Sequence, residues 1–196
     1  MLFPAVHNGK LPRYRANPYI VITFDLQPNN MAGKNYILSK EDAVYKLRRL
    51  ALELAEELSG DETPVVVIGI RNSGTVIAEK VGELLREHIP NQVQVISATL
   101  DKTHPTEVQL SQDMDFNNLN IVLADDVSNS GKTLLYALKP LLQYHPKTIR
   151  TLVLVERMHK LFPIKPDHVG LSIATTLQSH IQVEVVDGEV VGAFMN

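Results

Sequence analysis

Apolar and polar positions follow no regular period in residues 1–34, a proline-rich stretch whose single apolar run, Tyr19–Phe24, suggests one strand. Regular patterns begin only after Met31. We therefore expect residues 1–34 to be a flexible N-terminal extension and residues 35–196 to form a single domain. Our hypothesis is that residues 1–30 are either an arm that is dispensable for the folding of that domain or the result of an upstream start site.

The first regular segment is an amphipathic helix. Ser39 suits its N-cap, and Asp42 stands three residues later, as in a partial capping box. Gly60 is a suitable stop. The apolar side of the helix recurs at helical spacing and consists of Ala43, Leu47, Leu50, Ala51, Leu54 and Leu58.

After this helix, continuous apolar runs alternate with amphipathic stretches. Continuous apolar runs are typical of strands in a parallel sheet that is covered on both faces. The predicted strands are Pro64–Ile70, Val93–Leu100, Ile121–Ala124, Ile149–Val155 and His168–Ile173, and the predicted helices are Thr75–Glu87 and Lys132–Tyr144. The tail predicts a hairpin of Gln182–Val186 and Val190–Phe194 around an Asp-Gly turn. The fold class is therefore α/β, with a central, mostly parallel sheet and helices on both faces.

Length and composition narrow the class of protein. The 196 residues suit one globular domain, and the absence of cysteine excludes disulfides, thiolate nucleophiles and cysteine metal sites. No apolar run approaches the ~20 residues that span a bilayer, and no secretory signal pattern opens the chain. We expect a cytoplasmic protein without membrane contact. The net charge of −3 creates no overall basic field for nucleic acid.

The segment Asn120–Thr133 has the most informative pattern. A buried strand ending at Ala124 runs into two adjacent carboxylates, Asp125 and Asp126, and a loop of small polar residues then leads into a helix. Ligands of open parallel sheets bind where the strands present their carboxyl ends. Backbone N–H groups at a helix start, together with hydroxyl side chains, suit a phosphate.

Because two carboxylates repel a phosphate, they indicate a ligand that also presents hydroxyls or a divalent metal. A ribose 5-phosphate fits, with its diol, or a magnesium ion bound to it, facing Asp125 and Asp126. A nucleoside-triphosphatase loop is excluded, because Gly131, Lys132 and Thr133 would need a glycine at position 126. An ordinary solvated turn before a helix is the alternative.

The run VLADDVSNSGKT at 122–133 resembles the signature of type I phosphoribosyltransferases that binds 5-phosphoribosyl 1-pyrophosphate (PRPP). The resemblance extends over about Tyr36–Phe194. In the order of its motifs, the chain is most similar to the branch of bifunctional pyrimidine-operon attenuation regulators with uracil phosphoribosyltransferase activity. Those motifs are the helix from Leu38, GIRNSG at 69–74, Thr99 with Leu100, LVERMHKLFP at 154–163 and HVG at 168–170.

The resemblance implies a small hood beside the sheet and a role for each matched segment. Asp125 and Asp126 would hold the ribose hydroxyls of PRPP with Mg²⁺ nearby, and Arg71 and Lys102 would neutralise the leaving pyrophosphate. The loop around the 5′-phosphate would consist of Val127, Ser128, Asn129, Ser130, Gly131, Lys132 and Thr133. The pyrophosphate loop would consist of Gly69, Ile70, Arg71, Asn72, Ser73 and Gly74.

Other roles concern the lid and the base. The polar, aperiodic residues 101–118 would close over PRPP and exclude water, with His104 as a second cation for the pyrophosphate. Arg157 and His159 would lie near the base, in the hood. Family members that act on 6-oxopurines usually carry an aspartate at the position of Asn129, so the resemblance favours a pyrimidine.

We therefore expect a PRPP-dependent phosphoribosyltransferase that acts on uracil and forms a homodimer or higher oligomer. Two alternatives stay open, an RNA-binding regulator of pyrimidine genes that senses nucleotides and a PRPP-binding protein with little turnover. RNA would need a basic surface, for which the candidates are Arg48, Arg49, Arg71, Arg150, Arg157 and Lys160. The chain departs from the regulator branch at Ser73, Asp101, Glu156 and Met158, which bears on uracil specificity and turnover.

Overall fold

The computed structural model describes residues 35–101, 105, 107–174 and 180–195. The strands are β1 (Asn35–Leu38), β2 (Val65–Ile70), β3 (Val93–Leu100), β4 (Val108–Leu110), β5 (Asn120–Ser128), β6 (Thr148–Arg157), β7 (His168–Ile173), β8 (Ile181–Val186) and β9 (Glu189–Met195). The helices are α1 (Lys40–Glu57), α2 (Arg71–His88), α3 (Lys132–Ala137) and the 3₁₀ helix η1 (Lys139–Leu141). The proposed N-terminal extension, with the strand expected at Tyr19–Phe24, lies outside the described residues.

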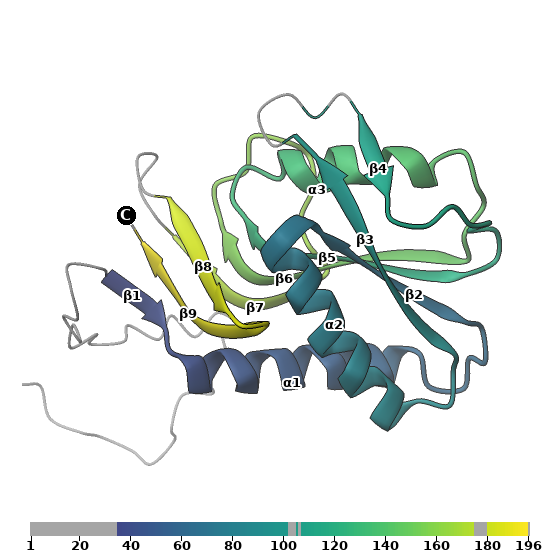
Figure 1. Cartoon of the computed structure of the whole chain (residues 1–196), viewed down its shortest axis with the longest axis horizontal. Coiled ribbons are helices and arrows are strands. Elements are labelled where there is room, and N and C mark those ends of the chain that lie inside the picture. The colour runs from purple at the N-terminus through teal and green to yellow at the C-terminus, as the bar shows by residue number, and fades with distance from the viewer. Residues whose placement is uncertain (1–34, 102–104, 106, 175–179, 196) are drawn as a thin grey trace, which may run out of the picture.

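A six-stranded sheet in the order β4-β3-β2-β5-β6-β7 forms the centre of the fold (Figure 1). All neighbours in it run parallel except β4, which runs antiparallel to β3. One core packs α1 and α2 against one face, and a second core packs α3 and η1 against the other. The predicted α/β fold is confirmed.

Connectivity places a switch point between β2 and β5. From β2 the chain passes through α2 to β3 on one side, and it later returns to β5 on the other side of β2. The loops that leave β2 and β5 therefore diverge from adjacent strand ends. Such crevices, at the carboxyl ends of the strands, are where open α/β sheets bind ligands.

The first helix forms as its sequence predicts. The Ser39 hydroxyl accepts a hydrogen bond of 3.1 Å from the Asp42 backbone N–H at the start of α1. The predicted apolar side, including the fully buried Leu50 and Leu54, faces the core. Beyond the helix end, Gly60 adopts a φ of +78°, a conformation that costs glycine little.

A smaller antiparallel sheet in the order β1-β9-β8 forms the hood beside the main sheet (Figure 1). Its predicted hairpin turns at Asp187 and Gly188, both with positive φ. The hydroxyl of Tyr36 donates to Glu184 over 2.9 Å and so links β1 to β8. An ion pair of 2.5 Å between Lys80 and Glu189 ties the hood to α2.

Three predicted boundaries are wrong by more than two residues. The strand expected to end at Ala124 continues to Ser128, because its backbone pairs with β6 past the carboxylates. The helix expected from Thr75 begins at Arg71, so the first turn of α2 contains most of the predicted pyrophosphate loop. The helix expected over Lys132–Tyr144 is α3 followed by η1, because Pro140 lacks the N–H that an α-helix needs there.

Part of the predicted lid is also fixed structure. β4 pairs antiparallel with β3, and Phe116 is 1% exposed in the core beneath η1. Apolar residues at 108, 110 and 116 provide the reason, because they can be buried against the sheet. The lid prediction can therefore hold only for the segment before β4, in which residues 102–104 and 106 lie outside the described residues.

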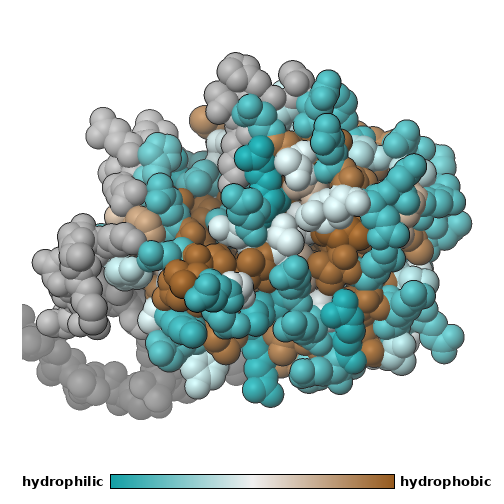
Figure 2. Space-filling view, viewed as in Figure 1, coloured by the Kyte–Doolittle hydropathy of each residue, from teal (hydrophilic) through white to brown (hydrophobic). Residues whose placement is uncertain are grey.

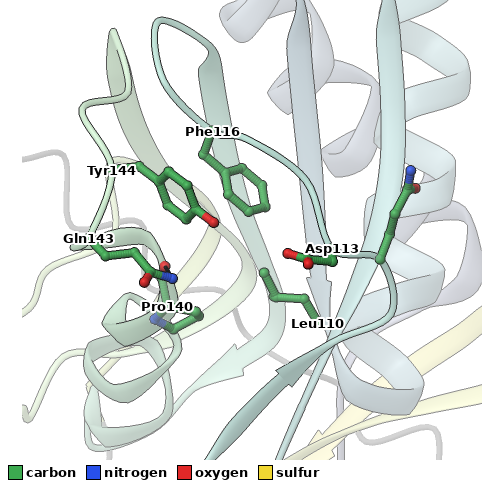
Figure 3. A pocket seen from close by; sticks show the side chains of 7 residues that line it. Leu110, Asp113, Phe116, Pro140, Gln143 and Tyr144 are labelled. Atoms are coloured by element: carbon green, nitrogen blue, oxygen red, sulfur yellow. Dashed lines mark hydrogen bonds between the residues drawn. The ribbon is translucent and has the colours of Figure 1, made fainter.

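The surface has a concavity on the α3 side of the sheet. It measures about 200 Å³ and is lined by β4, the segment after it and the residues around η1. Figure 3 shows Phe116 and Tyr144 together on one side, and their rings meet edge to face at 5.3 Å. Four residues of the predicted lid range line it, and none of the residues predicted to contact PRPP or the base does.

Apolar surface on the face shown in Figure 2 gathers in two areas with hydrophilic side chains between them. No helix in the described part of the chain is long and apolar enough to cross a membrane.

Candidate active site

The two predicted anion-binding segments meet at the switch point. β2 and β5 are parallel neighbours, with Gly69 opposite Ala124 near their carboxyl ends. Gly74, in the first turn of α2, packs against the end of β5. A Cβ on Gly74 would lie 3.0 Å from Oδ1 of Asp125 and 3.2 Å from the carbonyl oxygen of Ala124. Glycine thus brings the first turn of α2 into direct contact with the acidic strand end.

The turn from β2 into α2 is tightly packed. A Cβ on Gly69 would lie 2.5 Å from the Cα of Thr75 and 2.7 Å from the carbonyl oxygen of Gly74, so only glycine allows this approach. Arg71 has a φ of +46°, which costs a non-glycine residue about 1–3 kcal/mol and is typical of functional sites.

This turn also presents free hydrogen-bond donors. The Nε of Arg71 is buried and has no hydrogen-bond partner among the described residues. The N-cap residue of α2, an 18-residue helix, is Ile70, whose side chain makes no capping hydrogen bond, and the first N–H groups of a helix have no partner within the helix. These donors and the helix dipole suit an anion such as pyrophosphate.

The two aspartates lie in the last residues of β5. Asp125 is 1% and Asp126 9% exposed. The Oδ1 atom of Asp125 accepts from the Asp126 N–H, and that of Asp126 accepts from the Val127 N–H, both over 2.9 Å. These local bonds hold both carboxylates in place at the strand end.

The aspartates fit Mg²⁺ only with help from a substrate. The described residues contain no group of three or more side chains arranged as metal ligands. Mg²⁺ is commonly held by one or two carboxylates together with water and substrate phosphate oxygens. Asp125 and Asp126 match this pattern and could hold the ion jointly with a bound ligand.

The loop after β5 encloses a small cavity of about 70 Å³. Its lining consists of Asp125, Val127, Ser128, Asn129, Ser130, Gly131, Thr133 and Leu134. Gly131 has a φ of +83°, and Oδ1 of Asn129 is buried without a described hydrogen-bond partner. Since α3 has only six residues, the loop N–H groups, rather than a long helix dipole, are the donors that this loop could offer to a phosphate.

The segment Lys160–Ile164, for which we expected no role in PRPP binding, packs behind this loop. The ammonium of Lys160 donates to Ser128, over 2.9 Å to its carbonyl and 2.7 Å to its hydroxyl. It also lies 3.4 Å from the buried Glu156 carboxylate. Burial lowers the pKa of Lys160, and the charge of Glu156 opposes that effect. The position of Lys160 just after β6 could have indicated this contact, because β6 and β5 are parallel neighbours that end at the same edge of the sheet.

The two residues expected near the base, Arg157 and His159, differ in their exposure to solvent. Arg157 is 8% exposed at the end of β6, whereas His159 is exposed to solvent. A wider cavity of about 540 Å³ opens between the start of α2 and the hood, lined by Asn72, Ser73, Gln182, Val183, Glu184, Val185 and Phe194. Lys102 and His104 lie outside the described residues.

Comparison with known proteins agrees with this geometry. Residues 35–187 match the family model described as the phosphoribosyl transferase domain. The chain belongs to this family. The predicted resemblance to phosphoribosyltransferases is thereby confirmed.

Two relatives of this phosphoribosyltransferase confirm the predicted regulator branch. The chain is 31% identical over 171 residues to the bifunctional protein PyrR of Clostridium novyi, covering 81% of this chain and 96% of the relative. It is 33% identical over 173 residues to the bifunctional protein PyrR of Leuconostoc mesenteroides, covering 86% of each chain.

Solved structures share the fold of this phosphoribosyltransferase. A hypoxanthine phosphoribosyltransferase of Trypanosoma cruzi superimposes with a TM-score of 0.65 at 15% identity, covering 80% of this chain and 93% of that one. A hypoxanthine-guanine phosphoribosyltransferase of Bacillus anthracis gives 0.62 at 22% identity, covering 76% and 86%. At these identities the likeness establishes the fold and leaves the base open.

Proposed function

We propose that this protein transfers the phosphoribosyl group of PRPP to uracil, forming a nucleoside 5′-monophosphate and pyrophosphate. The contact between Gly74 and Asp125 carries the proposal. It joins an anion-binding turn, a carboxylate pair and a second anion-binding loop at one edge of the sheet. PRPP presents a pyrophosphate, a diol and a phosphate in that arrangement.

Each part of the site has a distinct task in this reaction. Asp125 and Asp126 accept hydrogen bonds from the two ribose hydroxyls and fix the sugar as positive charge develops at its C1 carbon. The N–H groups of the loop 128–131 hold the 5′-phosphate. Arg71 and the first turn of α2 hold the pyrophosphate and stabilise the negative charge that it gains on leaving. When bound beside the carboxylates, Mg²⁺ would supply further neutralisation of that charge.

The hood cavity is the proposed place for the base. It opens between Ser73, one residue from the Gly74 contact, and strand β8. Asn129, which lines the small cavity after β5, offers an amide, which cannot accept a proton at neutral pH as a carboxylate can. Enzymes of the family that act on 6-oxopurines usually carry a carboxylate at this position. This chain lacks it, and transfer to uracil does not require it.

RNA binding has less support from the residues considered for it. Arg49 pairs with Glu53 and donates to the carbonyls of Val169 and Gly170, and Arg150 pairs with Glu57 over 2.5 Å. Lys160 is directed toward Ser128. Cations neutralised in this way contribute little to phosphate binding along a nucleic acid.

The test is pyrophosphate release from PRPP and Mg²⁺ with each of uracil, orotate, hypoxanthine, guanine, xanthine and adenine. We expect release with uracil. Asp126→Asn should abolish this release. Asp187→Asn, the same change in the exposed hairpin turn, where asparagine is equally suited, is its matched control and should leave the rate unchanged. If pyrophosphate is released with a purine but not with uracil, the preference for a pyrimidine inferred from Asn129 is wrong. Silence with all six bases, in a protein that still binds PRPP, would favour the binding-only alternative.

A further inference from the structure

Lys160 is a lysine turned inward. Its side chain is 15% exposed, although it follows a strand end at the protein surface. Its ammonium contacts the carbonyl and hydroxyl of Ser128 and lies 3.4 Å from Oε1 of Glu156, whose Oε2 accepts a hydrogen bond from Ser172. A buried lysine costs stability unless its partners compensate, so this arrangement requires a reason.

The next two residues bind the same loop through their backbone. The N–H groups of Leu161 and Phe162 both donate to the carbonyl of Ser130, over 3.0 and 3.1 Å. Two alternate carbonyls of the loop, those of Ser128 and Ser130, therefore point at the segment 160–162.

The direction of these carbonyls also fixes the direction of the N–H groups that follow them in the chain. In a planar trans peptide the C=O and the following N–H point in opposite directions. With the carbonyls of Ser128 and Ser130 turned toward Lys160–Phe162, the N–H groups of Asn129 and Gly131 point the other way. The cavity of about 70 Å³ is lined by Asn129 and Gly131 and by no residue of 160–164, so it lies on that other side.

Close packing also places the segment 160–164 on the side of the loop opposite the cavity. A Cβ on Gly131 would lie 3.0 Å from Cγ2 of Ile164 and 3.4 Å from the carbonyl oxygen of Phe162. The segment 160–164 is thus the wall behind the loop, and the phosphate side is in front.

We propose that Lys160 is a positioning residue, which holds the Ser128 carbonyl against the wall so that the loop presents its N–H groups to the 5′-phosphate of PRPP. This inference rests on the proposed function. Glu156 keeps the ammonium in place and offsets its charge. Lys160 itself needs no contact with the substrate.

The test compares Lys160→Met, Lys160→Arg and the matched control Lys165→Met, which changes an exposed lysine just after the segment 160–164. Dissociation constants for PRPP with Mg²⁺ and for pyrophosphate alone are measured by calorimetry, together with KM for PRPP and for uracil. We expect Lys160→Met to weaken PRPP binding about ten- to a hundred-fold, the range of one or two hydrogen bonds to a charged group. Pyrophosphate affinity and the KM for uracil should stay within about two-fold of wild type, and Lys160→Arg and Lys165→Met should bind PRPP nearly as wild type does.

Each outcome decides the proposal. Equal PRPP binding by wild type and Lys160→Met would overturn it, as would a parallel loss of pyrophosphate affinity, which indicates a general structural role. If Lys160→Met does not fold, Lys160→Met with Glu156→Gln removes the unpaired carboxylate and is compared with Glu156→Gln alone. Failure of the wild type to bind PRPP would instead refute the proposed function, so the two failures are distinguishable.

Discussion

Replacing Gly69 by alanine should disturb the stability of the fold and the site together. The new Cβ would lie 2.5 Å from the Cα of Thr75, 2.7 Å from the carbonyl oxygen of Gly74 and 2.8 Å from Cβ of Ala78. Two of these atoms are backbone, so no rotamer change relieves the clash. Bringing the nearest contact to the 3.4 Å of ordinary van der Waals contact requires the first turn of α2 to move away from β2 by about 0.9 Å.

The magnitude follows from the cost of overpacking, about 1–3 kcal/mol, with the upper half of that range expected for a backbone clash. For a chain of this size, about 2–3 kcal/mol lowers the Tm by roughly 4–12 °C. The same displacement moves Gly74 relative to Asp125 and turns the N–H groups of the first turn away from the pyrophosphate. We expect at least a ten-fold increase in the KM for PRPP at a temperature where the variant is fully folded.

Gly170→Ala is the matched control. Its Cβ would lie 2.4 Å from the carbonyl oxygen of Leu154, a comparable backbone clash between β7 and β6 and away from the Gly74–Asp125 contact. Thermal unfolding and pyrophosphate release are measured for both variants. Both should lose stability, but only Gly69→Ala should lose PRPP affinity. A Gly69→Ala protein that unfolds earlier yet keeps the wild-type KM would refute the role given to this turn.

Three further predictions follow from other parts of the molecule. Removal of Mg²⁺ by EDTA should stop pyrophosphate release and added Mg²⁺ should restore it; full activity in EDTA would contradict the metal role of Asp125 and Asp126. Hydrogen bonds from Thr63, Asn120 and Lys147 hold the pKa of Asp61 well below its usual value of 3.8, so the stability that ionised Asp61 contributes is present above that value and lost as the pH falls. The free energy of unfolding measured in urea should therefore be higher for wild type than for Asp61→Asn, and this difference should narrow below about pH 4. A difference that stays constant with pH would contradict this. A chain that begins at Met31 should keep the wild-type Tm, and its aggregation would reject the hypothesis that residues 1–30 are dispensable.

The central sheet was predictable because its strands are covered on both faces. Such strands read as continuous apolar runs, and the structure places β2, β3 and β7 within one residue of the predicted bounds. The meeting of the segments around Gly69 and Asp125 also follows from the sequence, because parallel strands present their carboxyl ends at one edge. The capping pattern at Ser39 is local and was therefore readable as well.

Other features depend on contacts between distant parts of the chain. Strand β1 exists because Asn35–Leu38 pairs with β9 at the other end of the domain, which no local pattern indicates. The end of β5 was missed because Asp125 and Asp126 interrupt the apolar run, although the backbone continues to pair with β6. The inward turn of Lys160 depends on Ser128 and Glu156, which lie on two adjacent strands.

The most direct test of the account is a calorimetric titration of PRPP with Mg²⁺ into wild type and Asp126→Asn. We expect one PRPP site per chain and a loss of affinity of about ten- to a hundred-fold in the variant, because a charged acceptor for the ribose hydroxyls is removed. Pyrophosphate alone should bind both proteins similarly, since its proposed site is the first turn of α2. Wild-type affinity for PRPP in Asp126→Asn would contradict the claim that the ends of β2 and β5 form one PRPP site.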